Sequence, residues 1–337
     1  MTRIVKVLSV LRLSDAQLDR LRAVSPTLEV SQTTCKTAED MLPLLGEPEV
    51  IYTYHADFAP EQAPNLKWAQ LSSAGVDHVL DKPIMRSSIA ITTASGIHAV
   101  PIAEYVFASM LSFARRFPLA MSLQQKREWP KGRWDALRAQ ELRGATLGII
   151  GYGSIGREVG RLAKAFGMTV LASKRSPQTR EDGGWIAPGA GDPHMAHADR
   201  VYGPDQLEEM AAECDFVVVA LPLTTDTREL VSEAVLRAMK PTAYFVNISR
   251  GEVVDEEALI RILREGAIAG AGLDVFWQEP LPPESPFYDL PNVILTPHIS
   301  GNSAAYNDRA TDLFAENLRR YLAGEPLLNL VDKQRGY

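Results

Sequence analysis

Cysteine is scarce in this 337-residue sequence: Cys35 and Cys214 are the only two, and they form no CxxC spacing. A disulfide framework and a zinc site are therefore not indicated, no metal is expected, and a reducing cytoplasm is the compartment that fits. Long apolar runs are also missing. No stretch approaches the ~20 apolar residues of a membrane span, and Arg3, Lys6 and Arg12 interrupt the apolar start before a signal peptide could form. We expect no membrane association.

The sequence also lacks a long run of basic residues, and its formal net charge is -7 at pH 7. Nucleic-acid binding needs clustered Lys and Arg to neutralise phosphates. We therefore expect a small-molecule ligand and no nucleic-acid partner. The length exceeds one average domain of roughly 100 to 200 residues, which indicates two domains.

Short β-rich runs alternate with helical patterns along the whole chain, as in RIVKVLSV followed by SDAQLDRLRAVSP. This alternation predicts an α/β fold with parallel sheets covered by helices. Ser14 and Gln17 have the spacing of a capping box at the start of the first helix. An apolar helix over residues 101–126, with Pro118 as a kink, is either a core helix or lies between domains or against a second subunit. Residues 177–202 are rich in Gly, Pro and Ala and predict a mobile surface loop, with a lid over a cofactor as the alternative.

A βαβ unit follows at LGIIGYGSIGREVGRLAKAFGMTVLAS. Gly151, Gly153 and Gly156 form GxGxxG between its first strand and its helix, where they allow a tight turn, close approach to a pyrophosphate and helix packing. The free N–H groups at the helix start would receive the phosphates. The sequence therefore predicts a dinucleotide site.

The end of the second strand carries Ser173, Lys174 and Arg175, where an NAD-binding fold has an acidic residue. A cation cannot accept hydrogen bonds from the ribose 2′-OH, but Lys174 and Arg175 can bind a 2′-phosphate. This predicts a preference for NADP(H), with use of NAD(H) left open. The alternative is a solvated basic pair that faces away from the ligand.

Arg250, Glu279 and His298 each follow an apolar strand, and ligands of open α/β sheets bind beyond the carboxyl ends of the strands. Arg250 can bind a carboxylate through two hydrogen bonds, and His298 can donate a proton to a carbonyl oxygen that becomes an alkoxide. Glu279 could orient the imidazole. Arg250 and His298 would thus supply the carboxylate-binding cation and the proton donor that reduction of a 2-oxo acid needs. Singly, however, these residues fit better a salt bridge, a solvated loop residue and a structural histidine.

The segments SSAGVDH, GIHAVPIAEYVFA, VVVALPLTTDTREL, VNISRGEVVDEEAL, AGAGLDVFWQEPLP and LTPHISG, together with the βαβ unit, resemble the D-isomer-specific 2-hydroxyacid dehydrogenase family in order and approximate spacing. The resemblance covers nearly the whole chain. It implies two doubly wound parallel sheets and a homodimer. A Rossmann cofactor domain at residues 99–302 would be inserted into a smaller flavodoxin-like substrate domain formed by residues 1–98 and 303–337.

The resemblance also implies roles for single residues. Arg250 would bind the substrate carboxylate together with the backbone N–H groups of Gly75 and Val76, and His298 would be the acid/base with Glu279 as its partner. The expected dinucleotide contacts are Gly151, Tyr152, Gly153, Ser154, Ile155, Gly156, Ser173, Lys174, Arg175, Pro222, Thr227, Asp274 and Gly301.

The expected function is reduction of glyoxylate or hydroxypyruvate to the D-2-hydroxy acid with NADPH, as in the NADP-preferring branch of the family. One alternative is a phosphoglycerate dehydrogenase-like enzyme, for which His55, His78 and Lys82 are candidate phosphate-binding cations. A nucleotide-sensing interaction module, as in related corepressors, is another. Glu279 argues against a formate dehydrogenase, which has Gln there, and His98 departs from the Asn of many members.

Overall fold

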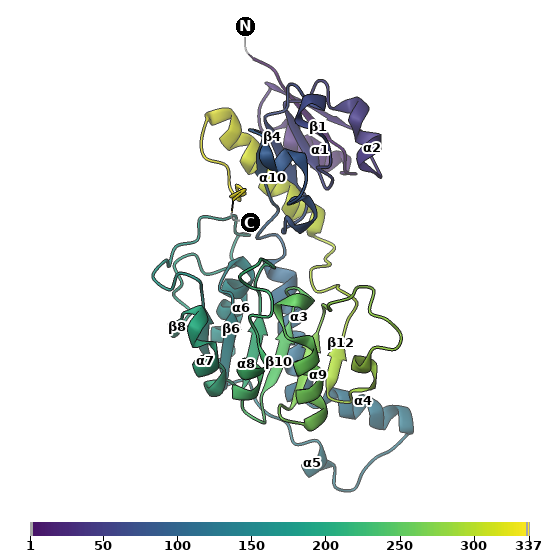
Figure 1. The fold of residues 1–337 in the computed structure, drawn as a ribbon, viewed down its shortest axis with the longest axis vertical. Coiled ribbons are helices and arrows are strands. Elements are labelled where there is room, and N and C mark those ends of the chain that lie inside the picture. Colours follow the sequence, from purple (N-terminus) through teal and green to yellow (C-terminus); the bar gives the residue numbers. More distant parts are fainter. Residues whose placement is uncertain (1–2, 335, 337) are drawn as a thin grey trace. The chain divides into compact units, whose positions relative to one another are not determined.

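The computed structural model describes residues 3–334 and 336, which form two compact units (Figure 1). Unit 1 comprises Met1–His98, Gly183–Ala187 and Ser303–Tyr337, and unit 2 comprises Ala99–Asp182 and Pro188–Asn302. Each unit contains one parallel sheet with helices packed on it, so the predicted α/β fold with two parallel-sheet domains is confirmed. The ends of the ranges expected for the substrate domain, residues 1–2, 335 and 337, lie outside the described residues.

The sheet of unit 1 has the strand order β2-β1-β3-β4-β5, and all of its pairs are parallel. This is the order of flavodoxin-like folds. Its strands are β1 (Val5–Ser9), β2 (Leu28–Gln32), β3 (Val50–Thr53), β4 (Trp68–Leu71) and β5 (Ala90–Thr92). Its helices are α1 (Asp15–Arg22), α2 (Ala38–Met41), α10 (Tyr306–Ala323) and the short η1 (Leu42–Leu44), η2 (Pro60–Gln62), η3 (Asp77–Val79) and η4 (Pro83–Arg86). The capping box predicted at Ser14 and Gln17 is present at the start of α1.

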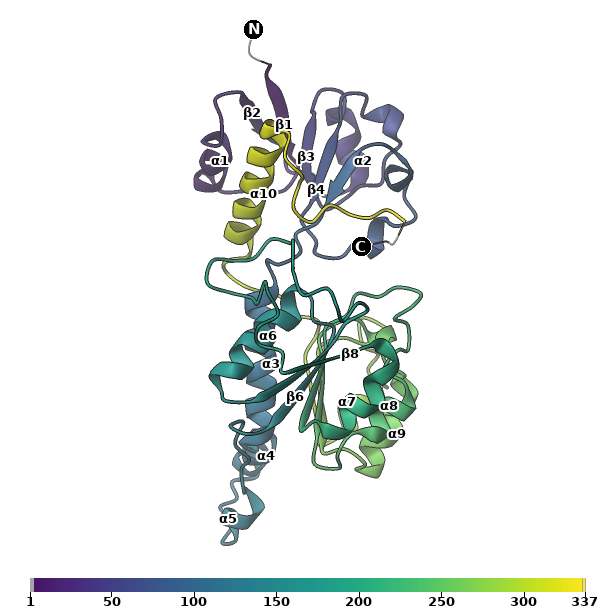
Figure 2. The ribbon, with the colours of Figure 1, turned by 90° about the vertical axis from the view of Figure 1, so that its left-hand side faces the viewer.

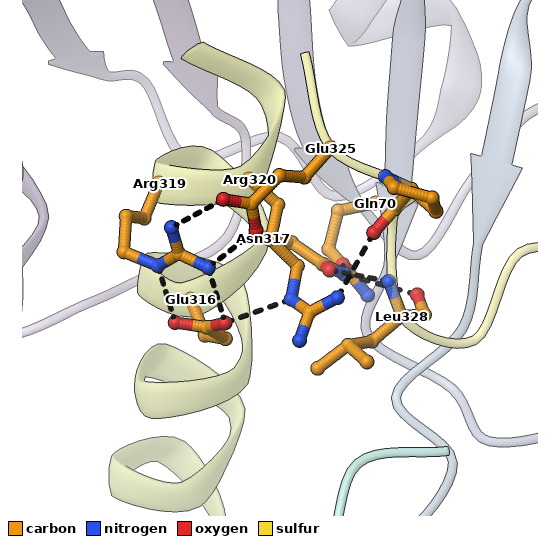
Figure 3. A network of polar contacts seen from close by, with 8 residues as sticks. Gln70, Glu316, Asn317, Arg319, Arg320, Glu325 and Leu328 are labelled. Carbon is orange, nitrogen blue, oxygen red and sulfur yellow. Dashed lines mark hydrogen bonds and ion pairs between the residues drawn. The ribbon is translucent and has the colours of Figure 1, made fainter. Parts of the chain in front are cut away.

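The C-terminal helix α10 is held to the sheet of unit 1 by a buried amide (Figure 3). The side chain of Asn317 donates to Gln70 Oε1 on β4 and to the carbonyl of Leu328, both at 3.1 Å, and accepts from Leu328 N–H at 2.8 Å. Glu316 and Glu325 bind Arg319 on the outer face of the same helix. The chain therefore ends on the unit in which it begins.

The sheet of unit 2 has the order β12-β11-β10-β9-β6-β7-β8, again all parallel. Its strands are β6 (Thr146–Ile150), β7 (Thr169–Ser173), β8 (Arg200–Tyr202), β9 (Phe216–Val219), β10 (Tyr244–Asn247), β11 (Gly270–Leu273) and β12 (Val293–Leu295). The strand order reverses between β6 and β9, and dinucleotides bind at such a switch point.

Helices cover both faces of this sheet (Figure 2). One face carries α3 (Ala99–Ala114) and α6 (Ser154–Ala165), and the other carries α7 (Leu207–Glu213), α8 (Glu233–Ala238) and α9 (Glu256–Glu265). The remaining helices of unit 2 are α4 (Phe117–Lys126), α5 (Arg133–Ala136), η5 (Pro204–Gln206), η6 (Gly251–Val253) and η7 (Pro286–Asp289). None of the helices in the described part of the chain combines the length and apolar character that a bilayer crossing requires.

The apolar helix predicted over residues 101–126 is two helices, α3 and α4. It breaks at Arg116, which has a left-handed φ of 60°, just before Pro118. The sequence therefore predicted an interruption near Pro118, but the structure has a break between two helices in place of a kink in one. α3 is a core helix, with Phe113 stacked on Tyr244 of β10 at 4.6 Å between ring centroids. α4, in contrast, has no buried residue.

The long loop between β7 and β8 lies largely on the surface but is anchored at a few buried residues. Arg157 of α6 is 1% exposed and donates to the carbonyls of Asp192 and Arg180, while Tyr152 OH donates to Asp192 Oδ2 at 2.9 Å. Met195 is fully buried. The prediction of a surface loop therefore holds for most of residues 177–202 but is wrong for Asp192 and Met195. A buried guanidinium needs carbonyl and carboxylate partners, and the loop supplies them.

Residues 183–187 of this loop belong to unit 1, although the sequence placed them in the cofactor domain. The N–H of Trp185 donates to Asn329 Oδ1 at 3.1 Å, and Trp185 is 9% exposed. Gly96 has a φ of +94°, and a Cβ there would lie 2.1 Å from the carbonyl oxygen of Trp185. Only glycine at position 96 leaves room for this segment.

Candidate active site

The carboxyl ends of β10, β11 and β12 meet at one edge of the sheet of unit 2, because the three strands are neighbours and parallel. Asn247 pairs with Leu273, and Leu273 pairs with Leu295, so the strand ends are level. Arg250 lies just beyond the first strand, Glu279 beyond the second and His298 beyond the third. The fold thus carries all three predicted catalytic side chains beyond the same edge.

His298 and Glu279 are in direct contact. His298 Nδ1 lies 2.7 Å from Glu279 Oε2. A carboxylate only accepts, so Nδ1 carries the proton of this hydrogen bond and Nε2 is the nitrogen left for a substrate oxygen. The other carboxylate oxygen of Glu279 accepts from the N–H of Phe276 at 3.0 Å, which fixes its orientation. The imidazole is 47% exposed, so a ligand can reach it.

The backbone around His298 is held by Asp274, which directly follows β11. His298 has a left-handed φ of 53°, which is uncommon for a residue with a side chain. Its N–H donates to the carbonyl of Asp274 at 2.9 Å, and the carboxylate of Asp274 accepts from the N–H groups of Ile299 and Ser300. Asp274 was expected to contact a nicotinamide amide; its visible partners belong to the His298 loop, which ends at Gly301.

Arg250 is placed beside the Glu279 loop by its neighbour Gly251. A Cβ on Gly251 would lie 2.0 Å from the carbonyl carbon of Phe276, so no larger residue fits without displacing backbone. Arg250 is partly buried, and its Nη1 donates to the carbonyl of Ser249 at 2.8 Å. Sequence reasoning missed the part played by Gly251, because the close approach joins two segments that are remote in the chain.

The glycine turn between β6 and α6 fits a dinucleotide. Gly151 has a φ of +101°, and a Cβ on Gly156 would lie 2.3 Å from the carbonyl oxygen of Gly151. Beside Gly153, by contrast, there is open space. The first and third glycines are thus required by packing, and the second leaves room for a pyrophosphate at the start of α6, where Ser154 and Ile155 form the first turn. The side chain of Tyr152 points into the protein, so it offers a ligand only its backbone.

Both basic residues after β7, Lys174 and Arg175, have partners in unit 2. Lys174 Nζ donates to the carbonyl of Thr179 at 2.6 Å, and burial, followed by the guanidinium of Arg157, lowers the pKa of Lys174. Arg175 Nη2 lies 3.6 Å from Oδ2 of the exposed Asp226. An exposed ion pair such as that of Arg175 with Asp226 contributes little free energy.

The other residues expected to contact the dinucleotide lie in the loop after β9 and at the end of β7. Thr227 Oγ1 donates to the carbonyl of Pro222 at 2.6 Å and accepts from the N–H of Thr224, which shapes the loop that carries Asp226. Ser173 is buried, and its carbonyl accepts from the N–H groups of Gly151 and Tyr152. Its role is therefore to join the second strand to the glycine turn.

In unit 1, Gly75 and Val76 lie in the loop that follows β4. Among the described residues, no backbone carbonyl accepts from their N–H groups.

The candidate phosphate-binding cations of unit 1 have partners of their own. Lys82 Nζ lies 3.1 Å from Asp57 Oδ2, and His78 Nε2 donates to the carbonyl of Tyr54 at 3.0 Å. The ring of His55 packs edge-on against Tyr54, and that of His98 against Tyr306. Within the described ranges, no group of His, Cys, Asp and Glu is arranged to hold a metal ion.

Comparison with known proteins agrees with this geometry. Residues 107–300 match the model of the NAD-binding domain of D-isomer-specific 2-hydroxyacid dehydrogenases. The chain is 35% identical over 314 residues to a glyoxylate reductase from Korarchaeum cryptofilum, covering 92% of this chain and 87% of that protein. It is 39% identical over 280 residues to a glyoxylate reductase from Thermococcus gammatolerans, covering 81% of this chain and 78% of that protein.

A solved structure is also similar. It is an NADPH-dependent glyoxylate/hydroxypyruvate reductase from Sinorhizobium meliloti in complex with NADP and sulfate, with 28% identity, a TM-score of 0.77 and coverage of 99% of this chain and 100% of that chain. Together with the sheet and the glycine turn, these matches define an α/β oxidoreductase that uses a nicotinamide cofactor and acts on CH–OH groups. The chain belongs to the D-isomer-specific 2-hydroxyacid dehydrogenase family.

Proposed function

We propose that the protein reduces glyoxylate or hydroxypyruvate to the D-2-hydroxy acid and prefers NADPH. The observation that carries the proposal is the contact between His298 and Glu279 beyond the sheet edge that also carries Arg250. The names of the relatives support the substrate, and Lys174 and Arg175 support the cofactor. In this proposal unit 2 binds the cofactor, and unit 1 contributes Gly75 and Val76 to the substrate.

The residues divide the reaction between them. Arg250 binds the carboxylate of the substrate through two parallel hydrogen bonds, aided by the N–H groups of Gly75 and Val76. A reduced nicotinamide bound at the glycine turn before α6 would supply the hydride for this reduction. His298 Nε2 donates its proton to the carbonyl oxygen as negative charge develops there. Glu279 accepts the Nδ1 proton and keeps the ring oriented through the transfer.

The deciding experiment measures oxidation of NADPH and NADH with glyoxylate, hydroxypyruvate, pyruvate and an aryl 2-oxo acid. We expect turnover with glyoxylate or hydroxypyruvate, and a fall in kcat of about 100-fold or more in His298→Gln, since general acid catalysis contributes on that order. Tyr288→Phe, an exposed residue of η7, is the control and keeps wild-type turnover. Full activity of His298→Gln would show that another group donates the proton.

We also propose that the protein is a homodimer formed through α4 and the segment after it. Phe117, Leu119 and Met121 are exposed on α4, and Trp129 and Trp134 are 84% and 79% exposed beyond it. Apolar patches of this kind on a folded protein mark interaction sites. A second copy of the same chain, bringing the same residues, is the partner that we propose.

A reducing compartment such as the cytoplasm completes the proposal. Cys35 and Cys214 are both buried and form no disulfide. Burial raises the pKa of Cys214 to about 12 and also raises that of Cys35, so neither thiol is reactive at neutral pH. Two such thiols fit a protein that matures without oxidation.

A further inference from the structure

The loop that carries His298 has a support that the proposed reaction does not use. His298 has a left-handed backbone, a conformation that persists only where the surroundings hold it. The support begins at Asp274, which is 0% exposed and has no salt bridge in the described part of the chain.

The donors to Asp274 come from one short segment. Oδ1 accepts from the hydroxyl of Thr296 at 2.5 Å and from the N–H of Ile299 at 2.9 Å, and Oδ2 accepts from the N–H of Ser300 at 2.8 Å. These three residues bracket His298. The position of its imidazole thus depends on how firmly the carboxylate of Asp274 is held.

A tyrosine on another element extends this network. Tyr105 of α3 places its hydroxyl 2.7 Å from Thr296 Oγ1. The single proton of the Thr296 hydroxyl goes to the carboxylate, which can only accept, so Tyr105 must be the donor to Thr296. Burial raises the pKa of Tyr105 to about 12, so its hydroxyl keeps this proton throughout an enzyme assay. Hydrogen bonds in such a chain polarise and strengthen one another.

We propose that Tyr105 is a positioning residue for His298, acting through Thr296 and Asp274. Its hydroxyl fixes the rotation of the Thr296 side chain, which orients the carboxylate that binds the backbone on both sides of the imidazole. The inference rests on the proposed function, in which His298 Nε2 donates the proton. It adds α3, a helix that carries none of the catalytic side chains, to the elements that set the proton-transfer geometry.

Tyr105→Phe tests the proposal by removing only the hydroxyl. We expect kcat for glyoxylate to fall about tenfold, because small misplacement of a catalytic group has costs of this order, while the KM for NADPH stays unchanged. Tyr244→Phe is the matched control. Tyr244 is also buried and packs on α3 through Phe113, and its hydroxyl accepts from Arg116, away from the His298 loop. Its kcat remains that of the wild type.

Variants of Thr296 separate positioning from a general loss of structure. Thr296→Val breaks the chain of hydrogen bonds from Tyr105 to Asp274 and lowers kcat as Tyr105→Phe does. Thr296→Ser keeps a hydroxyl at this position and therefore keeps the wild-type kcat. The double variant Tyr105→Phe with Thr296→Val is no slower than Thr296→Val alone, because both changes cut the same chain. Wild-type kcat in Tyr105→Phe, or strictly additive losses in the double variant, would overturn the proposal.

Hydrogen exchange distinguishes failure of this inference from failure of the proposed function. If the wild-type protein reduces none of the 2-oxo acids tested, the proposed function fails and kcat gives no answer about Tyr105. Exchange of the backbone N–H groups of residues 298–301, followed by mass spectrometry, does not need turnover. Faster exchange in Tyr105→Phe than in Tyr244→Phe supports the chain, and equal exchange in the two variants overturns it.

Discussion

Lys174 and Arg175 bear most directly on the choice of cofactor, because they place two cations at the end of β7, where an NAD-binding fold has an acidic residue. We predict that the double variant Lys174→Ala with Arg175→Ala loses about tenfold or more in kcat/KM for NADPH relative to NADH, since hydrogen bonds to charged groups contribute about 1.5 to 3 kcal/mol each. Arg264→Ala, an exposed cation on α9, is the control. An unchanged ratio of the two cofactors would contradict the assignment.

The pH dependence of binding gives a second measure of the same pair. The pKa of Lys174 is lowered from the ordinary 10.5, first by burial and then by Arg157. As pH rises towards this lowered pKa, Lys174 loses its proton and the site loses a cation, so the Kd for NADPH should begin to increase at a pH below the ordinary 10.5. The Kd for NADH should stay constant over the same pH range, because NADH has no 2′-phosphate. Lys174→Arg keeps its charge over this range and should remove the dependence.

Sequence reasoning at the residue scale identified side chains with distinctive chemistry. Glu279 and His298 are 19 residues apart, and their hydrogen bond could be anticipated only because both follow strands whose ends meet. Tyr105 could not be found in the same way. A single tyrosine in an apolar helix is indistinguishable from a core residue until its hydroxyl is seen beside Thr296, 191 positions along the chain.

The tight contact of Gly251 with Phe276 shows how two elements are joined at the site. A Cβ on Gly251 would meet backbone atoms, which cannot rotate away as a side chain can. We predict that Gly251→Ala lowers the free energy of unfolding by about 1 to 3 kcal/mol, the usual cost of overpacking, and also lowers kcat/KM because Arg250 and the Glu279 loop move apart.

The measurements for Gly251→Ala are thermal unfolding and steady-state kinetics, with Gly132→Ala as the control. Gly132 precedes α5 with a negative φ, and a Cβ at this position would have no neighbouring atom within 4 Å. Gly132→Ala should leave both stability and kinetics unchanged. Equal behaviour of the two variants would show that the Gly251 contact relaxes without consequence.

Elements with a local signal were the ones that the sequence predicted well. The capping box of α1, the glycine turn before α6 and the break before Pro118 each depend on residues a few positions apart. The anchoring of the long loop between β7 and β8, in contrast, depends on residues that are far apart in the sequence. Arg157 donates hydrogen bonds to the carbonyls of Asp192 and Arg180, which lie 35 and 23 residues further along the chain. No periodicity in the sequence predicts a buried arginine with such partners.

At the scale of the whole molecule, the chain changes unit after His98, Asp182, Ala187 and Asn302. The family resemblance accounts for the first and the last of these changes. The middle two depend on Trp185, whose contact with Asn329 spans 144 residues. Contacts of this kind are set by which surfaces meet in the folded protein, so composition indicated a loop there and nothing more.

The exposed residues of α4 and the segment after it carry the last prediction, which concerns assembly. Arg133 lies over the rings of both Trp129 and Trp134, at 6.0 and 5.3 Å from their centroids, which presents two exposed indoles together. Aromatic residues and arginine are enriched in the central parts of protein interfaces. We predict that the wild-type protein sediments as a dimer and that Trp129→Ser with Trp134→Ser shifts it towards the monomer. Tyr288→Ser, which removes an exposed aromatic from η7, should leave the dimer intact. A wild-type monomer, or a double variant that still dimerises fully, would place the contact elsewhere, because loss of two exposed indoles cannot be neutral if they form the centre of the interface.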